Sequence, residues 1–336
     1  MKSEWRHVFI VGSPRSGTSW LQMMLASHPD VVSSVETTMY SAYISPCFSA
    51  WRREQEAIET RRWVKGLPHL MSKQQFKTAL NPLLMTAYEA IAAKRPTART
   101  ILEKAPENIF QISIIREFIP TARFVHIIRD GRDVVCSMRN VKRRVGHQTQ
   151  DIERGARLWR QSIEAARSAL SNDPEYIEVR YETLLADPCS EMHNVFEFCA
   201  LPITSGQIAA ICDQHTFEKM SHDLPTADPD KSVKGNAGNY HKGCAGTWES
   251  EMSDMDRHCF CLEAGELLNG LGYADKDWLA QYELRPGSRP TQRALRFLTA
   301  RLYFLAGLML GSATANRLLI QHQSTRASRK LEDRMQ

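Results

Sequence analysis

Short apolar runs alternate with longer segments of mixed polarity along most of the chain, a pattern that predicts strands followed by helices. The runs that favour strands lie at residues 8–11, 31–38, 100–108, 124–128 and 176–181. Apolar side chains recur at helical spacing behind three of them, at residues 20–25, 109–118 and from about 134 onward. We therefore expect a three-layer α/β fold with a central parallel sheet, in which ligands bind at the carboxyl ends of the strands.

Residues 39–99 do not follow this alternation. Their pattern is mostly helical and rich in aromatic side chains, with breaks expected at residues 66–68 and 81–82, where Gly and Pro occur. An insertion between strands is where an α/β enzyme usually builds specificity for its substrate. Packing of the aromatic side chains would give the same composition, and the spacing favours neither explanation.

The most distinctive stretch is VFIVGSPRSGTSWLQMML, residues 8–25, in which a strand, a Gly-containing loop and a helix follow one another. Backbone N–H groups at a helix N-terminus converge on an anion, so this arrangement predicts a phosphate site. A nucleoside triphosphate loop has Lys directly after its second Gly. Here Thr18 follows Gly17, and the cation is Arg15 inside the loop. A nucleotide or small-molecule kinase is therefore the alternative and not the first interpretation.

Composition and charge limit the class of protein. The 336 residues are 43% hydrophobic, which is enough for a packed core. The formal net charge of +5 arises at the end of the chain, where residues 291–336 hold eight Arg and Lys against two acidic residues. The rest is close to neutral, which gives no support to nucleic-acid binding. We expect a catalytic domain over residues 1–290 and a basic amphipathic tail over residues 291–336.

The eight Cys are scattered, without a Cys-x-x-Cys pair or a spacing typical of metal ligands, so no metal site is expected. No charged segment followed by an apolar stretch precedes the first strand, and nothing in this region predicts secretion. Reduced thiols and a cytoplasmic location are the expectation.

Two further segments lead from the loop to a family. FVHIIRDGRDVVCSM places Arg129 at the end of a strand and Ser137 eight residues later. Together with PRSGTSWL, this pattern resembles sulfotransferases that use 3′-phosphoadenylyl sulfate (PAPS) and release adenosine 3′,5′-bisphosphate (PAP), in which such an Arg and Ser hold the 3′-phosphate. The resemblance implies a P-loop NTPase-like sulfotransferase fold without an obligatory metal. A surface ion pair between Arg129 and Asp130 is the structural alternative.

RYETLLADP and HKGCAGTW are also similar to segments of this family. The resemblance implies that Tyr181 lies near the adenosine and that a Gly-rich lid contacts the 3′-phosphate. The residues that it assigns to nucleotide binding are Arg15, Ser16, Gly17, Thr18, Ser19, Trp20, Arg129, Ser137, Tyr181, Lys242 and Gly243.

The reaction needs cations at the leaving group and a base at the attacking hydroxyl. Glu36 in VETT resembles the Glu of the tyrosylprotein sulfotransferases, which is their base, and Lys104 in LEKAPEN stands where they have Lys-x-Pro. We assign catalytic roles to Glu36 as general base, to Lys104 and to Arg15. A helix cap or ion pair is the structural alternative for Glu36, and His126 is expected to be a core histidine.

This resemblance does not define the acceptor. Because the sequence shows no N-terminal anchor and no sign of an oxidising compartment, we expect a hydroxyl of a carbohydrate, lipid or natural product. The uncharged run at residues 302–316 would cover about 22 Å as a helix, less than the ~30 Å of a bilayer core. The tail could lie on the inner membrane surface, pack on the domain or form a homodimer contact. A scaffold that binds nucleotide and membrane without turnover is a further alternative.

Overall fold

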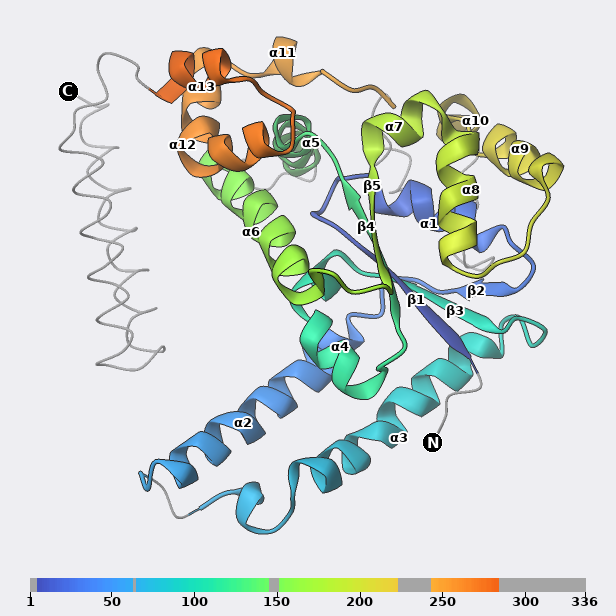
Figure 1. The fold of residues 1–336 in the computed structure, drawn as a ribbon, viewed down its shortest axis with the longest axis vertical. Helices are drawn as coiled ribbons and strands as arrows, with labels where there is room; N and C mark the ends of the chain where they lie inside the picture. The colour runs from blue at the N-terminus through green and yellow to red at the C-terminus, as the bar shows by residue number, and fades with distance from the viewer. Residues whose placement is uncertain (1–4, 63–64, 145–150, 223–242, 284–336) are drawn as a thin grey trace. The chain divides into compact units, whose positions relative to one another are not determined.

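The protein is described here from a computed structural model, which defines residues 5–62, 65–144, 151–222 and 243–283 (Figure 1). The chain divides into two compact units, Met1–Leu279 and Ala280–Gln336, and the first contains the sheet. The basic tail and Lys242 lie outside the described residues. The domain boundary at residue 290 and the roles of the tail therefore stay predictions.

A parallel sheet forms the centre of this unit. Its strands are β1 (Arg6–Val11), β2 (Val31–Ser33), β3 (Thr100–Lys104), β4 (Arg123–Ile128) and β5 (Tyr176–Arg180). Within the described part of the chain the sheet has five strands in the order β2-β3-β1-β4-β5, and all neighbouring pairs are parallel. The order reverses on the two sides of β1, so the loop that follows β1 lies at the point where ligands bind in such sheets.

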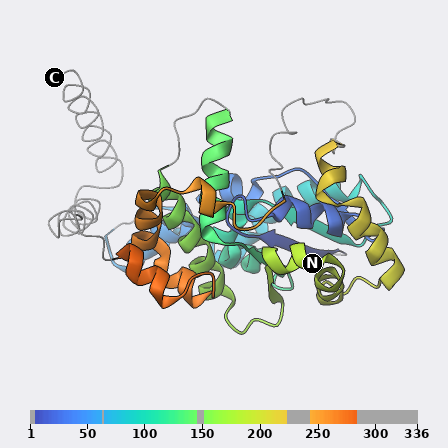
Figure 2. The same ribbon diagram turned by 90° about the horizontal axis from the view of Figure 1, so that it is seen from above.

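Both faces of the sheet are covered, as the apolar strands require. The side chains of β1 alternate: Phe9 and Val11 belong to one buried cluster, and Val8 and Ile10 to another. Figure 2 shows helices on both sides of the strands. The expected three-layer α/β fold is confirmed.

The helices divide between these clusters. The first cluster packs η1 (Met39–Ile44), α2 (Ser45–Glu59), α3 (Lys73–Ala92) and α4 (Ile112–Phe118) on the sheet. The second packs α1 (Thr18–Ala26), α7 (Tyr181–Ala186), α8 (Pro188–Phe198) and α9 (Ser205–Gln214). A third cluster joins α5 (Gly131–Arg144), α6 (Ile152–Leu170) and α12 (Asp254–Gly270). The short elements η2 (Leu67–His69), η3 (Pro106–Phe110), α10 (Phe217–His222) and α11 (Trp248–Glu251) and the helix α13 (Lys276–Glu283) complete the described chain.

The insertion of residues 39–99 is helical as expected, and its first break occurs at Gly66 and η2. The second expected break was wrong, because α3 continues through Pro82. Pro82 is exposed, while Phe76 before it and Leu84 and Tyr88 after it are buried. Packing on both sides of the proline thus stabilises the helix against the loss of one backbone hydrogen bond. In Figure 1, α2 and α3 extend away from the sheet.

The second strand is shorter than the sequence predicted. β2 ends at Ser33, and residues 34–38 form an irregular segment that leads into η1. Ser33 Oγ donates to the backbone oxygen of Leu102 at 3.0 Å, and the chain then leaves the edge of the sheet. This segment carries Glu36, so the candidate base lies on a loop beside β3 and not on a strand.

Candidate active site

The loop between β1 and α1 is a tight turn closed by a hydrogen bond from Ser16 N to Ser13 O at 3.1 Å. Gly17 precedes α1 with a φ of 100°, and a Cβ there would lie 2.6 Å from the Tyr181 ring. Only glycine meets both conditions. Thr18, Ser19 and Trp20 form the first turn of α1, and no side chain caps it. The loop therefore has the backbone geometry of an anion site.

Trp20 differs from its neighbours in this turn. Its indole N–H donates to the backbone oxygen of His215 at 3.0 Å, and its ring meets Tyr181 edge-on at 5.8 Å between centroids. The side chain thus joins α1 to the end of α9 and to Tyr181. Its assignment to the nucleotide stays a prediction.

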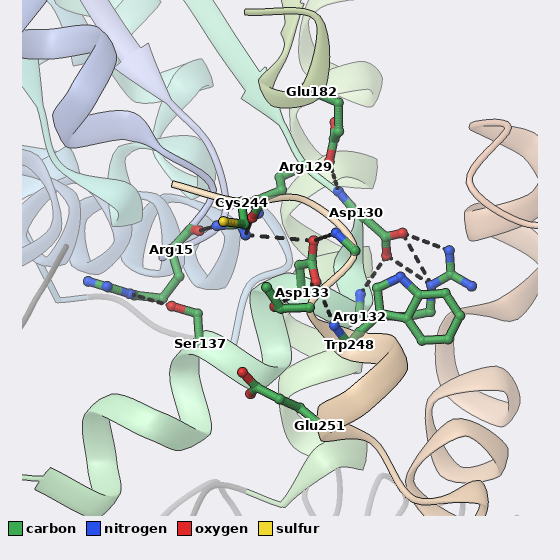
Figure 3. A network of polar contacts seen from close by, with 12 residues as sticks. Arg15, Arg129, Asp130, Arg132, Asp133, Ser137, Glu182, Cys244, Trp248 and Glu251 are labelled. Atoms are coloured by element: carbon green, nitrogen blue, oxygen red, sulfur yellow. Dashed lines mark hydrogen bonds and ion pairs between the residues drawn. The ribbon is translucent and has the colours of Figure 1, made fainter. Parts of the chain in front are cut away.

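Arg129 follows β4 directly and is nine-tenths buried. Its two Nη atoms donate to backbone oxygens, Nη1 to Arg15 at 3.4 Å and Nη2 to Cys244 at 2.9 Å (Figure 3). Its guanidinium lies 4.3 Å from the centroid of the Tyr181 ring, and Asp133 Oδ2 lies 3.6 Å from Nη2. Segments far apart in the sequence thus hold this arginine in one orientation.

The loop and the first turns of α5 meet at Arg15 and Ser137. Arg15 Nε donates to Ser137 Oγ at 3.2 Å, and Figure 3 shows the two side chains pointing toward one another. A cavity of about 120 Å³ opens here, lined by Arg129, Asp133, Ser137, Asn140, Cys244, Thr247 and Glu251. The arginine of the loop, the arginine of β4 and the serine of α5, which the sequence placed in one site, therefore lie together.

The surface ion pair between Arg129 and Asp130, which was the structural alternative, does not form. Asp130 pairs instead with Arg132, whose Nη2 lies 2.7 Å from Asp130 Oδ2, and both side chains are buried. Arg132 also donates to the Tyr273 backbone oxygen at 2.6 Å, and its guanidinium lies 3.6 Å from the centroid of the Trp248 ring. This neighbouring ion pair leaves Arg129 directed toward the loop.

Asp133 is a residue of the site that the sequence analysis missed. Its carboxylate accepts three hydrogen bonds from the segment before α11: Gly246 N at 2.8 Å, Thr247 Oγ1 at 3.0 Å and Trp248 N at 2.9 Å. Its side chain is fully buried. The signal in the sequence was its position four residues after Arg129 in the first turn of a helix, but the partners lie more than a hundred residues away. Asp133 fixes the Gly-rich segment over the cavity.

Gly243, which the sequence assigned to the lid, lies in this segment. Its φ is 50°, and a Cβ there would lie 2.4 Å from the ring of Phe217. Only a residue without a side chain allows the backbone to approach Phe217 so closely. Its contact with a phosphate stays a prediction.

Glu36 and Lys104 meet at the same edge of the sheet. Lys104 ends β3, pairs with Ile10 of β1 in the strand register, and forms an ion pair with Glu36 through Nζ and Oε1. The lysine side chain is 7% exposed and the glutamate side chain 45%. A buried cation therefore holds a carboxylate that solvent can reach.

Several buried polar atoms in this region fit a phosphorylated ligand. Among the described residues, Ser13 Oγ, Ser16 Oγ and Arg129 Nε are buried without a hydrogen-bond partner. Each could donate to an anion, and buried donors are nearly always paired. Together with Arg15, they form a donor set that suits phosphate or sulfuryl oxygens. No group of three or more His, Cys, Asp or Glu side chains in the described residues could hold a metal ion.

Two histidines outside the site have other roles. His126 is fully buried in β4, with Nδ1 2.8 Å from Tyr176 Oη, and burial lowers its pKa to about 4. His28 is buried beyond α1 and lies 3.0 Å from the Pro202 backbone oxygen. Both lie in the packed interior of the fold, as expected for His126.

Comparison with known proteins identifies the family of the chain. The model of the sulfotransferase family matches residues 7–205, more than half of the chain. The protein belongs to this family. The matched residues run from β1 to the start of α9 and include the loop, Glu36, Lys104, Arg129 and Ser137.

Two individual relatives share about a quarter of their residues with this chain over the matched region. The protein-tyrosine sulfotransferase of Drosophila melanogaster is 26% identical over 230 residues, which are 67% of this chain and 43% of that protein. Protein-tyrosine sulfotransferase A of Caenorhabditis elegans is 24% identical over 200 residues, 58% of this chain and 50% of that protein. The chain thus spans about half of the length of these curated relatives. The mouse sulfotransferase SULT7A1, solved with PAP, superposes with a TM-score of 0.50 at 16% identity over 84% of this chain and 90% of that one, which supports the fold.

No helix in the described residues is both long enough and apolar enough to cross a membrane. The membrane contact predicted for residues 291–336 concerns a segment that lies outside them.

Proposed function

We propose that the protein transfers the sulfuryl group of PAPS to an acceptor hydroxyl, with Glu36 as general base. The observation that carries the proposal is that Arg129 and Ser137 line one cavity and Arg15 contacts Ser137, with the Glu36–Lys104 pair at the same edge of the sheet. The part of this edge with Arg15, Arg129 and Ser137 would suit a nucleotide with two anionic ends. The Glu36–Lys104 pair would supply a base and a cation.

The nucleotide side would bind through charge and fixed geometry. Arg129 and Ser137 would hold the 3′-phosphate, because both line the cavity and Arg129 is braced from several sides. Arg15, Ser16 and the first turn of α1 would hold the 5′-phosphate and the sulfuryl oxygens. The Tyr181 ring lies between Gly17 and Arg129, where it would form one wall of the nucleoside site. Lys242 is assigned to the same phosphate by the sequence alone.

The acceptor side would do the proton transfer. Glu36 would remove the proton of the attacking hydroxyl while the oxygen of that hydroxyl bonds to sulfur. The bond between sulfur and the bridging oxygen of PAPS would break at the same time. Lys104 would stabilise the negative charge that develops on that oxygen. Its buried position beside Ile10, one residue before the end of β1, lies next to the start of the loop.

For the acceptor, we propose a hydroxyl of a carbohydrate, lipid or natural product. The relatives are named as enzymes of protein tyrosine, so a tyrosine peptide is the first competing acceptor. The 45% exposure of Glu36 would let an acceptor hydroxyl reach it, and the helical insertion of residues 39–99 beside it would shape the acceptor site.

The test is incubation of the full chain with ³⁵S-labelled PAPS and three acceptor pools: a lipid extract and a polar extract of the source cells, and a tyrosine-containing peptide. Label in either extract supports the proposal. Label only in the peptide corrects the acceptor, and label in none of the pools rejects turnover. A parallel thermal-shift titration compares PAP with Mg-ATP, and stabilisation by Mg-ATP alone would favour a kinase.

A further inference from the structure

A carboxyl group lies in the apolar core behind the candidate base. Glu103 is the penultimate residue of β3 and is 3% exposed. Oε1 accepts a hydrogen bond from Tyr88 Oη at 2.7 Å, and Oε2 accepts one from Thr37 Oγ1 at 3.1 Å. Tyr88 Oη also lies 2.9 Å from Tyr40 Oη. The carboxyl group therefore joins α3, η1 and the segment that carries Glu36.

Packing alone does not call for an acid at this position. Ile101 lies two residues earlier on the same face of β3 and is fully buried in the apolar cluster. Phe9, the register partner of Glu103 on β1, belongs to that cluster as well. An apolar residue would suit the same core, and burying a carboxyl group costs free energy unless its oxygens are paired. The hydrogen bonds that Glu103 accepts from Tyr88 and Thr37 explain why an acid stands at this position.

Two consecutive residues of β3 hold two consecutive residues of one loop. Lys104 pairs with Glu36, and Glu103 accepts from Thr37. Thr37 Oγ1 also receives the Met39 N–H at 3.4 Å, and Thr38 between them has a φ of 49°. This left-handed turn sets the direction in which the chain leaves β2 and enters η1. The Thr37 hydroxyl is thus held by two hydrogen bonds, one that it donates to Glu103 and one that it accepts from Met39 N.

We propose that Glu103 is a positioning residue for the candidate base, which holds Thr37 and thereby fixes the backbone from which Glu36 reaches Lys104 and the acceptor. This proposal rests on the proposed function of Glu36. Glu103 itself does not touch the acceptor, because its carboxyl group lies in the core on the other face of the strand from Lys104.

The ionisation of Glu103 provides a distinct readout. Burial raises its pKa to about 7. The groups that face it are Tyr88 of α3, Tyr40 of η1 and Thr37, and His7 of β1 lies edge-on to Tyr88 at 4.5 Å between centroids. Burial raises the pKa of both tyrosines and lowers that of His7 to about 4, so none of them titrates near pH 7. The ionised carboxylate accepts from two hydroxyls, whereas protonation makes one of its oxygens a donor and weakens the hydrogen bond that this oxygen accepts.

The test compares Thr37→Val, Glu103→Leu and Glu103→Gln with Tyr88→Phe as matched control. Tyr88→Phe removes the other hydrogen bond of Glu103 and leaves Thr37 in place. We expect Thr37→Val and Glu103→Leu to lower kcat roughly 10- to 100-fold with an unchanged Kd for PAP, since small misplacements of a catalytic group have effects of this size. The double variant should lose no more than the worse single variant. Tyr88→Phe should keep its kcat, and Glu103→Gln should remove an ionisation near pH 7 from the kcat profile.

Equal losses of kcat in Tyr88→Phe and Thr37→Val, or no loss in Thr37→Val, would overturn the proposal. Thr37→Val keeps the test decisive if Glu103→Leu does not fold. Amide hydrogen exchange over residues 36–39 gives a readout independent of turnover, and it should rise in Thr37→Val but not in Tyr88→Phe. An active Glu36→Gln variant would reject the proposed base, whatever the Glu103 variants show.

Discussion

The two sides of the candidate site are built differently. On the proposed nucleotide side, Arg129 is held by two backbone oxygens, an aromatic ring and a carboxylate, and the segment over the cavity is fixed by three hydrogen bonds to Asp133. On the acceptor side, Glu36 lies on a loop, its carboxylate is 45% exposed, and it pairs with Lys104. The nucleotide side is thus preorganised by buried contacts, and the acceptor side is anchored from behind, where β3 lies.

This difference indicates how such a fold separates two tasks. A sulfuryl donor that is always the same molecule is best bound by groups whose positions are set by the sheet and its helices. An acceptor that varies between proteins is best met on a loop, where residues can change without disturbing the core. Variants on the two sides should therefore affect different measured quantities.

The largest effect is expected at the base. Glu36→Gln removes the proton acceptor and keeps the shape, so turnover should fall roughly 10²- to 10⁴-fold. The Kd for PAP should stay within about twofold, because Glu36 is proposed to contact the acceptor and not the nucleotide. Initial rates with ³⁵S-labelled PAPS and isothermal titration with PAP measure the two quantities. Glu164→Gln, at an exposed glutamate of α6, is the control. A comparable loss of PAP affinity in Glu36→Gln would break the distinction between the two sides.

Arg129→Ala should affect binding first. The loss of charge-assisted hydrogen bonds of about 1.5–3 kcal/mol corresponds to a PAP affinity roughly 10- to 100-fold lower. Arg157→Ala is the matched control, because Arg157 is half exposed and pairs with Glu263 on the surface of α6 and α12. Titration with PAP at fixed ionic strength measures both variants. An affinity in Arg129→Ala equal to that of the control would remove Arg129 from the nucleotide site.

Asp133→Asn tests whether the nucleotide side depends on its anchored segment. The amide keeps one acceptor oxygen for three donors, so we expect a loss of stability of about 1–3 kcal/mol. Hydrogen exchange at residues 246–248 should increase, and the PAP affinity should fall by less than in Arg129→Ala. Asp254→Asn, at an exposed residue in the first turn of α12, is the control. Unchanged exchange at residues 246–248 would show that the segment is held by other contacts.

The sequence predicted those features that depend on neighbouring residues. The apolar runs located the strands, and because parallel strands end at one edge, the pattern alone placed Lys104 and Arg129 near the loop. It did not predict the partners of Asp133 or Glu103, whose contacts join segments far apart in the chain. It also indicated a break at Pro82, where tertiary packing overrides the local preference. What the sequence did not predict is thus the set of buried contacts that hold these side chains and segments, and the roles assigned to the side chains stay predictions.

The last expected effect concerns the dependence of stability on pH, and it isolates the contacts behind the acceptor side. The pKa of Glu103 is about 7 in the folded protein and about 4.5 when unfolded. Between these values the folded state binds more protons, so stability falls through this group as pH rises from about 4.5 to 7, by at most about 1.4 kcal/mol per pH unit. The opposite sign applies to His7 and His126, whose pKa values are lowered to about 4. Both histidines are present in wild type and in the Glu103→Gln variant, so their contributions cancel in the difference between the two free energies of unfolding. The free energy of unfolding of Glu103→Gln, measured by urea titration against wild type, should therefore gain on wild type up to about pH 7 and then stay level. A difference that does not change with pH would place the ionisation of Glu103 outside this range and would remove it as a readout of how Thr37 is held.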